Sequence, residues 1–304
     1  MKTEEYILAE HTNIDIDKID LPDLSEDELS NIEQLVEFTR HFQEINQLYR
    51  IFQVNLNEIL SHYRLNVNDK IENIINNNDE EDIIIVNALV INYISSAKTF
   101  VESIENFIAD KLGQSNKDLF KKSCLSSIYD DTFSYRLLIR LRDYAQHGHL
   151  PVYESWDKKY SFDLDQIVNT PHYNHNSKLK EELNKIRDEI ARKYTDNPRI
   201  VFSRSIAEFQ LRIIEIYKLF IDWISPQMEH LVTQLDELVK KRPEIVHSSK
   251  DELNGQVLYK IEDECLHMIT PNENIMDMLE LVKDDIKRNY EIQKKKFEES
   301  FKQK

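Results

Sequence analysis

The chain has 304 residues, of which 56 are acidic and 39 are lysine or arginine, so its net charge at pH 7 is −17. Hydrophobic residues make up 40% of it, while only 3 glycines and 7 prolines are present, against an average usage of about 7% and 5%. This composition argues against a strand-and-turn protein and predicts an all-α fold of long helices. The acidic charge opposes non-specific binding to nucleic acid or to an anionic membrane surface.

The N-terminal residues 1–24 are acidic, with scattered isoleucine and leucine. The alternation over residues 13–17 fits a short edge strand or a tail. The opening MKTEEYILAEH is acidic where a signal peptide is basic, and no run of 18 apolar residues occurs. We therefore expect a cytoplasmic protein that does not enter a membrane.

Two long helical patterns follow. Ser25 and Glu28 form a capping box, and apolar residues then keep helical spacing as far as Tyr63, which predicts one long helix. Residues 66–82 have the composition of a solvated loop. A second apolar stripe then predicts another long helix that stops near Gly113.

The stretch 131–151, DTFSYRLLIRLRDYAQHGHLP, predicts an amphipathic helix after a short connection at 114–130. Asp130 or Asp131 is suited to cap its start. Its apolar stripe, which should face a core, consists of Phe133, Leu137, Leu138, Leu141 and Ala145.

A polar face runs beside this stripe and reaches the end of the helix. It comprises Arg136, Arg140, Asp143 and His147. Gly148 occupies the position of a left-handed C-cap residue, and Pro151 follows three residues later. His147 is therefore expected at or next to the last helical position.

The second half of the chain continues the helical pattern. Residues 152–167 favour a loop or a small hairpin that packs over the end of the preceding helix. Residues 178–194 predict a charged helix, and a strongly apolar helix starts near Ile206 and continues to about Lys241. Pro226 lies within it and is a place where it can bend.

Four of these helices could close one bundle, so the chain divides into an N-terminal tail or strand (1–24), a helical bundle (25–242) and a C-terminal segment (243–304). In the last segment, residues 244–270 have a mixed pattern that favours no element. Residues 272–303 predict a final long helix.

The sequence lacks the motifs of several enzyme classes. GxxxxGK[ST], GxGxxG and HExxH phrases are absent, which excludes P-loop, Rossmann and zincin enzymes. Cys124 and Cys265 lack a ligand or disulfide spacing, and His172 with His175 has no third ligand nearby. We therefore expect no metal and no cofactor.

The phrase Arg142-Asp143-Tyr144-Ala145-Gln146-His147 resembles the R-x4-6-H motif of HEPN domains, in which a polar residue normally follows the arginine. The spacing is matched by four pairs, Arg140/His147, Arg142/His147, Arg142/His149 and Arg242/His247. Leu141 and Pro243 follow the other two arginines, so the pairs from Arg142 alone have the polar neighbour. The resemblance covers roughly residues 25–240 and implies a HEPN-like helical bundle.

This resemblance implies a metal-independent endoribonuclease, of the kind found as a toxin or antiphage-defence effector. His147 would be the general acid or base, Arg142 would hold the phosphate, and Asp143 would orient one of them. Attack by the RNA 2′-hydroxyl would leave a 2′,3′-cyclic phosphate and spare DNA. The residues expected to bind substrate are Arg136, Arg140, Tyr144 and His149.

Each of these residues also has an ordinary interpretation. Arg142 and Asp143 could form surface ion pairs, His147 could interact with the negative end of the helix dipole, and Tyr144 could be a packing residue. The alternative to the ribonuclease is therefore a catalytically inactive HEPN-like module that binds nucleotide, RNA or a protein partner.

The expected partners are RNA, a second copy of the chain, and an antitoxin or defence-system protein. On a continuous helix, residues five positions apart diverge by about 140°. In a single copy, the side chains of Arg142 and His147 would thus point apart and could not easily act on the same phosphate. A homodimer whose motif ends meet at a two-fold axis would gather both residues from both copies in one cleft, as the resemblance to HEPN ribonucleases also implies.

Overall fold

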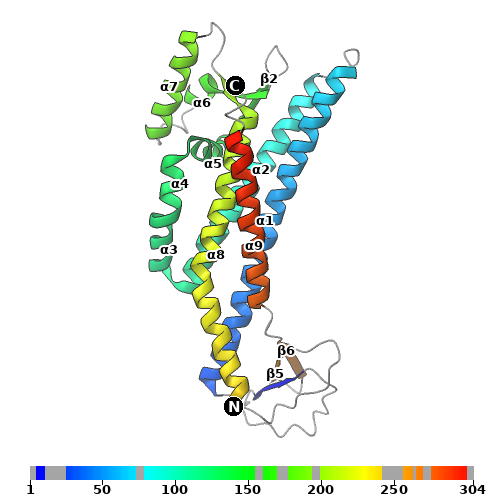
Figure 1. The fold of residues 1–304 in the computed structure, drawn as a ribbon, viewed down its shortest axis with the longest axis vertical. Coiled ribbons are helices and arrows are strands. Elements are labelled where there is room, and N and C mark those ends of the chain that lie inside the picture. The colour runs from blue at the N-terminus through cyan, green and yellow to red at the C-terminus, as the bar shows by residue number, and fades with distance from the viewer. Residues whose placement is uncertain are drawn as a thin grey trace. The chain divides into compact units, whose positions relative to one another are not determined.

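The structure is a computed structural model that describes residues 5–10, 25–72, 79–154, 160–169, 177–193, 199–241, 256–262, 265–269 and 275–299. Long helices dominate these residues, which confirms the predicted all-α class (Figure 1). The helices are α1 (Glu26–Glu72), α2 (Asp79–Leu112), α3 (Gln114–Phe120), α4 (Ser126–Asp131), α5 (Phe133–Gln146), α6 (Leu164–Asn169), α7 (Ser177–Lys193), α8 (Phe202–Lys241) and α9 (Ile275–Glu299), with a π-helical turn at Lys121–Leu125 between α3 and α4. The strands are β1 (Glu5–Glu10), β2 (Val152–Glu154), β3 (Tyr160–Asp163), β4 (Arg199–Val201), β5 (Gln256–Glu262) and β6 (Cys265–Ile269).

The chain forms two compact units, and each is assembled from separated stretches. The first contains Met1–Glu44 and Lys218–Lys287, and the second contains Ile45–Tyr217 and Arg288–Lys304. Helices α1, α8 and α9 are long enough to contribute residues to both units.

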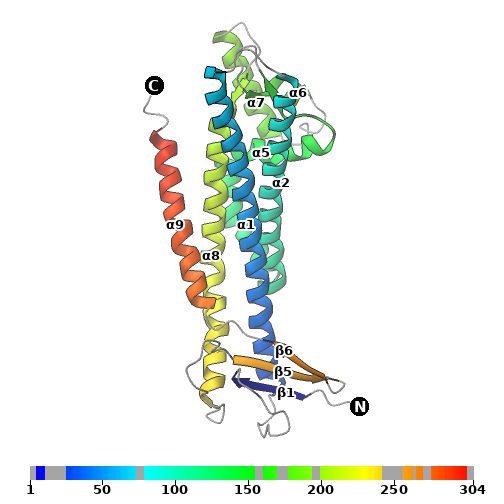
Figure 2. The same cartoon turned by 90° about the vertical axis from the view of Figure 1, so that its right-hand side faces the viewer.

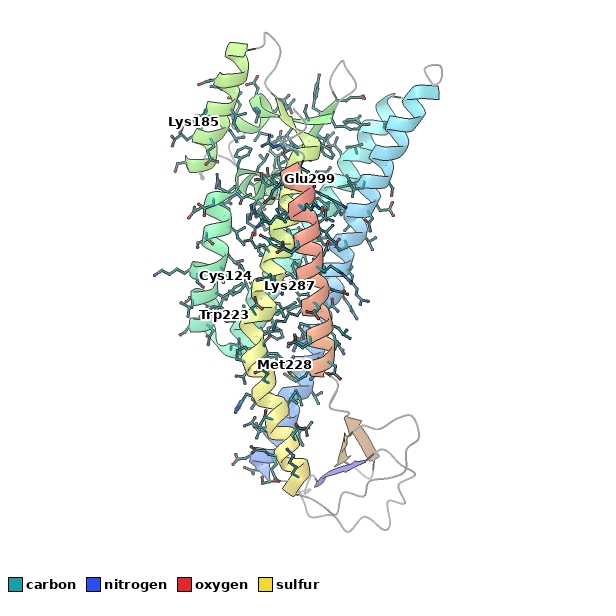
Figure 3. The ribbon with its side chains drawn as sticks, viewed as in Figure 1. Cys124, Lys185, Trp223, Met228, Lys287 and Glu299 are labelled. Atoms are coloured by element: carbon teal, nitrogen blue, oxygen red, sulfur yellow. The ribbon has the colours of Figure 1, made fainter. Side chains whose placement is uncertain are left out.

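In the first unit, α1 begins as the sequence predicts. The Ser25 N–H donates to Glu28 Oε2 (2.9 Å), and the Glu28 N–H donates to Ser25 Oγ (3.3 Å), which completes the capping box. The core of this unit includes Ile32, Leu35, Phe38 and Phe42 from α1, Ile221, Ile224, Met228, Leu231 and Leu235 from α8, and Ile275, Leu279 and Ile286 from α9. Figure 3 labels Met228 among these side chains.

The first unit also contains a three-stranded antiparallel sheet of order β1-β5-β6, visible in Figure 2. In its register Glu5 faces Ile261, and Leu258 faces Ile269. The strand at 5–10 lies before the alternating residues 13–17, which fall outside the described residues. The 244–270 segment, for which no element was predicted, contains the β5–β6 hairpin.

The core of the second unit is an array of aromatic rings from α1, α2 and α8. Tyr49 packs on Tyr217 (ring centroids 4.6 Å apart), Phe52 stacks on Tyr93 (4.9 Å), and Tyr93 meets Phe209 edge-on (5.6 Å). Burial raises the pKa of all three tyrosines above the ordinary value. Each such pair adds about 0.5–1.5 kcal/mol beyond the burial of its surface, so this array holds the three helices together.

Two loop predictions were wrong in extent. The loop predicted at 66–82 is helical in its described part, because α1 continues to Glu72 and α2 begins at Asp79. The predicted connection at 114–130 is helical instead, formed by α3, the π-helical turn and α4. Within it, Phe120, Cys124, Leu125 and Ile128 are buried at helical spacing, and no glycine or proline interrupts the stretch.

The remaining predicted elements are confirmed. The 152–167 stretch forms the antiparallel β2–β3 hairpin, with Val152 facing Phe162, and β4 adds a third strand to it. The charged helix is α7, and the apolar helix is α8, which continues through Pro226 to Lys241. The final helix is α9, which the structure describes over Ile275–Glu299 within the predicted 272–303. Helix α5 packs against α2, α4 and α7 (Figure 1).

Candidate functional site

Helix α5 contains most of the motif Arg142–His147, and it starts later than predicted. Its N-cap is Thr132, in an extended conformation (φ −120°, ψ 107°), and neither Asp130 nor Asp131 caps it. Those aspartates belong to α4, which ends at Asp131. The buried face is broader than the predicted stripe, because Tyr135 and Tyr144 join Leu137, Leu138 and Leu141 in the interior, whereas Phe133 and Ala145 are half-buried.

The C-terminal end of α5 is a Schellman turn. Gly148 has φ 88°, as predicted for a left-handed C-cap residue. Its N–H donates to the Ala145 carbonyl (3.0 Å), and the His149 N–H donates to the Tyr144 carbonyl (3.4 Å). This pattern satisfies carbonyls that the end of a helix otherwise leaves open. His147 is the C-cap residue itself, which confirms its expected position, and it is exposed.

Tyr144 and His149 stack on each other across this turn. Their ring centroids are 4.6 Å apart and their planes differ by 27°. The two positions are the ones between which a Schellman turn usually has an apolar contact. Tyr144 is only 2% exposed, so the structure gives it a packing role, and the exposed His149 covers one face of its ring.

Asp143 is the centre of an ion-pair cluster. Its Oδ1 accepts a hydrogen bond from Lys98 Nζ (2.7 Å) and lies 3.5 Å from Arg142 Nη1, while Oδ2 lies 3.9 Å from Arg140 Nη1. Burial disfavours the ionised carboxyl, but the hydrogen bonds and positive charges of Lys98 and Arg142 outweigh this effect and lower the pKa of Asp143. The Asp143 carboxylate thus pairs with three cationic side chains.

The predicted substrate-binding arginines have different surroundings. Arg140 has a side chain 44% exposed, and its Nε donates to the Tyr129 hydroxyl (3.4 Å). Arg136 is 3% exposed and donates to the backbone carbonyls of Tyr129 and Asp130 and to Glu182 of α7. The Arg136 guanidinium therefore fastens α5 to α4 and α7 and lies too deep to bind a substrate.

Helix α2 also holds the chain that follows the turn. The Asn87 side chain donates to the Val152 carbonyl (3.0 Å) and accepts from the Val152 N–H (2.9 Å), and it is 2% exposed. This pair of bonds imitates the pairing of a neighbouring strand. Lys98 binds α5 before the turn, and Asn87 binds β2 after it, so α2 fixes both sides of the segment 143–152.

The structure brings Arg140, Arg142 and Asp143 together with Lys98, whereas His147 lies further along the same helix. Because α5 stays helical through Gln146, the directions of Arg142 and His147 differ by about 140° around its axis. Sequence reasoning missed Lys98 and Asn87. The sequence did contain an indication of the role of Asn87, because it is the single polar residue in the apolar run IIIVNALVI. A side-chain amide that is buried in such a run needs a hydrogen-bond partner.

Helix α2 has a further property, because its segment Asp82–Leu112 is long and apolar enough to cross a membrane by length and composition alone. In this structure Val90, Ile94, Phe100 and Ile104 of that segment are in the protein core.

Within the described ranges, no three His, Cys, Asp or Glu side chains are grouped closely enough to hold a metal ion. Comparison of the chain with protein-family models, curated proteins and solved structures gives no match.

We expect Asn87→Ala to lower the free energy of unfolding by about 2–3 kcal/mol, because it leaves the buried N–H and carbonyl of Val152 unpaired. Urea denaturation followed by circular dichroism measures this change. Asn57→Ala, on the exposed face of α1, is the matched control and should stay within about 0.5 kcal/mol of the wild type. An Asn87 variant as stable as this control would contradict a stabilising role for the two Asn87–Val152 hydrogen bonds.

We also expect the carboxyl of Asp143 to titrate below its ordinary pKa of 3.8. A depressed carboxyl pKa contributes stability that is fully present above the unfolded value and is lost as pH falls through the folded value. The stability difference between the wild type and Asp143→Asn should therefore be constant above about pH 5 and shrink at lower pH. A ¹³C-detected NMR titration gives the midpoint directly, and a midpoint at or above 3.8 would contradict the ion-pair cluster.

Proposed function

We propose that this chain is a metal-independent endoribonuclease whose site is the C-terminal end of α5. The observation that carries the proposal is the Schellman turn, which presents an exposed histidine, His147, on the same helix end as the half-exposed Arg142 and the exposed Arg140. The resemblance of this phrase to the HEPN motif supports the same activity.

The residues are suited to cleavage of RNA by its own 2′-hydroxyl. As base, His147 would take the 2′-hydroxyl proton while the 2′-oxygen bonds to phosphorus, and the bond from phosphorus to the 5′-oxygen breaks. As acid, a histidine would return a proton to that 5′-oxygen. The products would be a 2′,3′-cyclic phosphate and a 5′-hydroxyl. An imidazole suits both roles because its ordinary pKa lies near neutrality.

Arg142 would stabilise the phosphate during this step. A guanidinium presents several N–H donors in a plane, which match phosphate oxygens and the negative charge that grows on them. Arg140 and His149 are exposed beside it and are the proposed substrate contacts. The buried positions of Arg136 and Tyr144 remove those two residues from the proposed substrate-binding set.

The cluster also has a favourable charge. Lys98, Arg140 and Arg142 outnumber the Asp143 carboxylate that they share. On a chain of net charge −17 this local excess can attract a phosphate at short range, while the overall field slows long-range approach. We propose RNA as substrate, the cytoplasm as location, and a toxin or antiphage-defence role regulated by an antitoxin or defence-system protein.

We expect His147→Ala to lower the cleavage rate of single-stranded RNA in EDTA by about 10²–10⁴-fold, the usual contribution of a general acid or base. Arg142→Ala should be similarly impaired because the phosphate loses its fork of donors. The assay is gel separation of labelled RNA.

Two matched controls separate this effect from general damage. His230 is an exposed histidine of α8, and Arg187 pairs with the adjacent Asp188 (3.3 Å) much as Arg142 pairs with Asp143. His230→Ala and Arg187→Ala should cleave like the wild type. Undiminished cleavage by the His147 and Arg142 variants, or cleavage that needs added Mg²⁺, would overturn the assignment.

The divergence of Arg142 and His147 supports a composite site made by two copies. In an isologous homodimer the α5 ends would meet, so that Arg142 of one copy and His147 of the other could hold the same phosphate. Leu150 and Tyr153, which follow the turn, are 62% and 45% exposed. Such apolar side chains beside the motif would suit a contact with the second copy.

Mixing two inactive variants tests this composite site. If Arg142→Ala and His147→Ala chains are co-expressed, random pairing gives about half mixed dimers. Their cleft retains one intact arginine and one intact histidine from different copies, so cleavage should return. Light scattering should show a dimer, and Leu150→Asp should shift it toward the monomer with loss of cleavage. A monomer with full activity, or no recovery on mixing, would contradict the dimer.

The second candidate function is a catalytically inactive module that binds RNA, nucleotide or a protein partner. The observation that favours it is the same divergence of Arg142 and His147 around α5, which prevents one copy from using them as a pair. Tight binding of single-stranded RNA in EDTA, without cleavage by the wild type, would support the module over the enzyme.

A further inference from the structure

The Asp143 carboxylate is not shared equally among its cationic neighbours. Lys98 Nζ lies 2.7 Å from Oδ1, within hydrogen-bond distance for an ammonium and a carboxylate, whereas Arg142 reaches the same oxygen with one nitrogen at 3.5 Å. A guanidinium normally pairs with a carboxylate through two parallel bonds. Arg142 does not do so here, and its Nε, which is buried, has no hydrogen-bond partner among the described residues.

We propose that Lys98 is a positioning residue of the α5 site: it occupies the Asp143 carboxylate and so leaves the donors of Arg142 for a phosphate. This inference rests on the proposed function, and it adds to the site a residue of another helix. Without Lys98, Arg142 at 3.5 Å would be the nearest remaining cation of Asp143, and the carboxylate would neutralise more of the charge that should hold the substrate.

The position of Lys98 suits this role. It lies on α2, which packs against α5, and the neighbouring Ala97 and Phe100 are buried in the core. Its side chain is 20% exposed, so the stem is held while the ammonium reaches Asp143. The other carboxylate near it, Glu102, is 4.0 Å away and 56% exposed, which makes it the weaker partner.

A double-mutant cycle in the full-length protein tests the inference. Lys98→Met removes the charge and keeps the stem, and we expect it to raise KM for single-stranded RNA about tenfold, the size typical of coupled neighbours, with a smaller change in kcat. Lys98→Arg should restore most of the loss. In the Asp143→Asn background, where no carboxylate competes for Arg142, Lys98→Met should add no further defect.

The control is Lys185→Met on α7 (Figure 3), which removes a lysine that pairs with Glu181 at 2.7 Å and should leave KM unchanged. Thermal denaturation checks that each variant is folded. An unchanged KM in Lys98→Met, or an equal loss in the wild-type and Asp143→Asn backgrounds, would overturn the inference, since the second outcome means that Lys98 acts on RNA or on the fold directly.

A readout without RNA separates this inference from the ribonuclease proposal. The Arg142 Nε–H resonance in a ¹⁵N spectrum reports the surroundings of the guanidinium. Lys98→Met should shift it when residue 143 is aspartate and leave it in place when residue 143 is asparagine. If the wild type does not cleave RNA, the proposed function fails and this spectrum still decides the inference. A resonance that does not move in either background would overturn it.

Discussion

The ion pair between Lys98 and Asp143 joins α2 to α5, and the arrangement of the candidate site depends on it. A half-buried carboxylate beside two arginines would be expected to pair with them, yet its shortest contact is to a lysine of another helix. The contact is stabilising only while both groups are charged and close. Asn87, on the same helix, fixes the chain after the turn through Val152. The exposed turn at His147 is thus built between two anchored points.

The charge distribution explains how such a site can exist on a strongly acidic chain. Exposed charges further apart than about 10 Å are largely screened at ordinary ionic strength. The acidic residues elsewhere would therefore slow the approach of RNA more than they would weaken a phosphate held by Arg142 in the proposed complex. Within the site, the sharing of one carboxylate by Lys98, Arg140 and Arg142 keeps the local charge positive, and Asp143 limits their mutual repulsion.

Local signals in the sequence predicted much of this arrangement. The capping box at Ser25, the left-handed Gly148 and the position of His147 follow from neighbouring residues, and the structure confirms them. The role of Arg136 was not predictable, because the carbonyls and the Glu182 carboxylate that bury it come from other helices. The same holds for Lys98, whose partner lies 45 residues away in the chain. Pairing of β1 (Glu5–Glu10) with β5 (Gln256–Glu262) joins strands that are far apart in the sequence, and periodicity within either strand gives no sign of it.

The chemistry of the cut RNA ends tests the central claim most directly. Single-stranded RNA is incubated with the wild-type protein in EDTA, and the new termini are identified by mass spectrometry. In the proposed reaction, attack by the 2′-hydroxyl with His147 moving the proton would give fragments that end in a 2′,3′-cyclic phosphate and begin with a 5′-hydroxyl. Fragments with a 3′-hydroxyl and a 5′-phosphate, or RNA that stays intact at every protein concentration, would contradict the assignment of the α5 site.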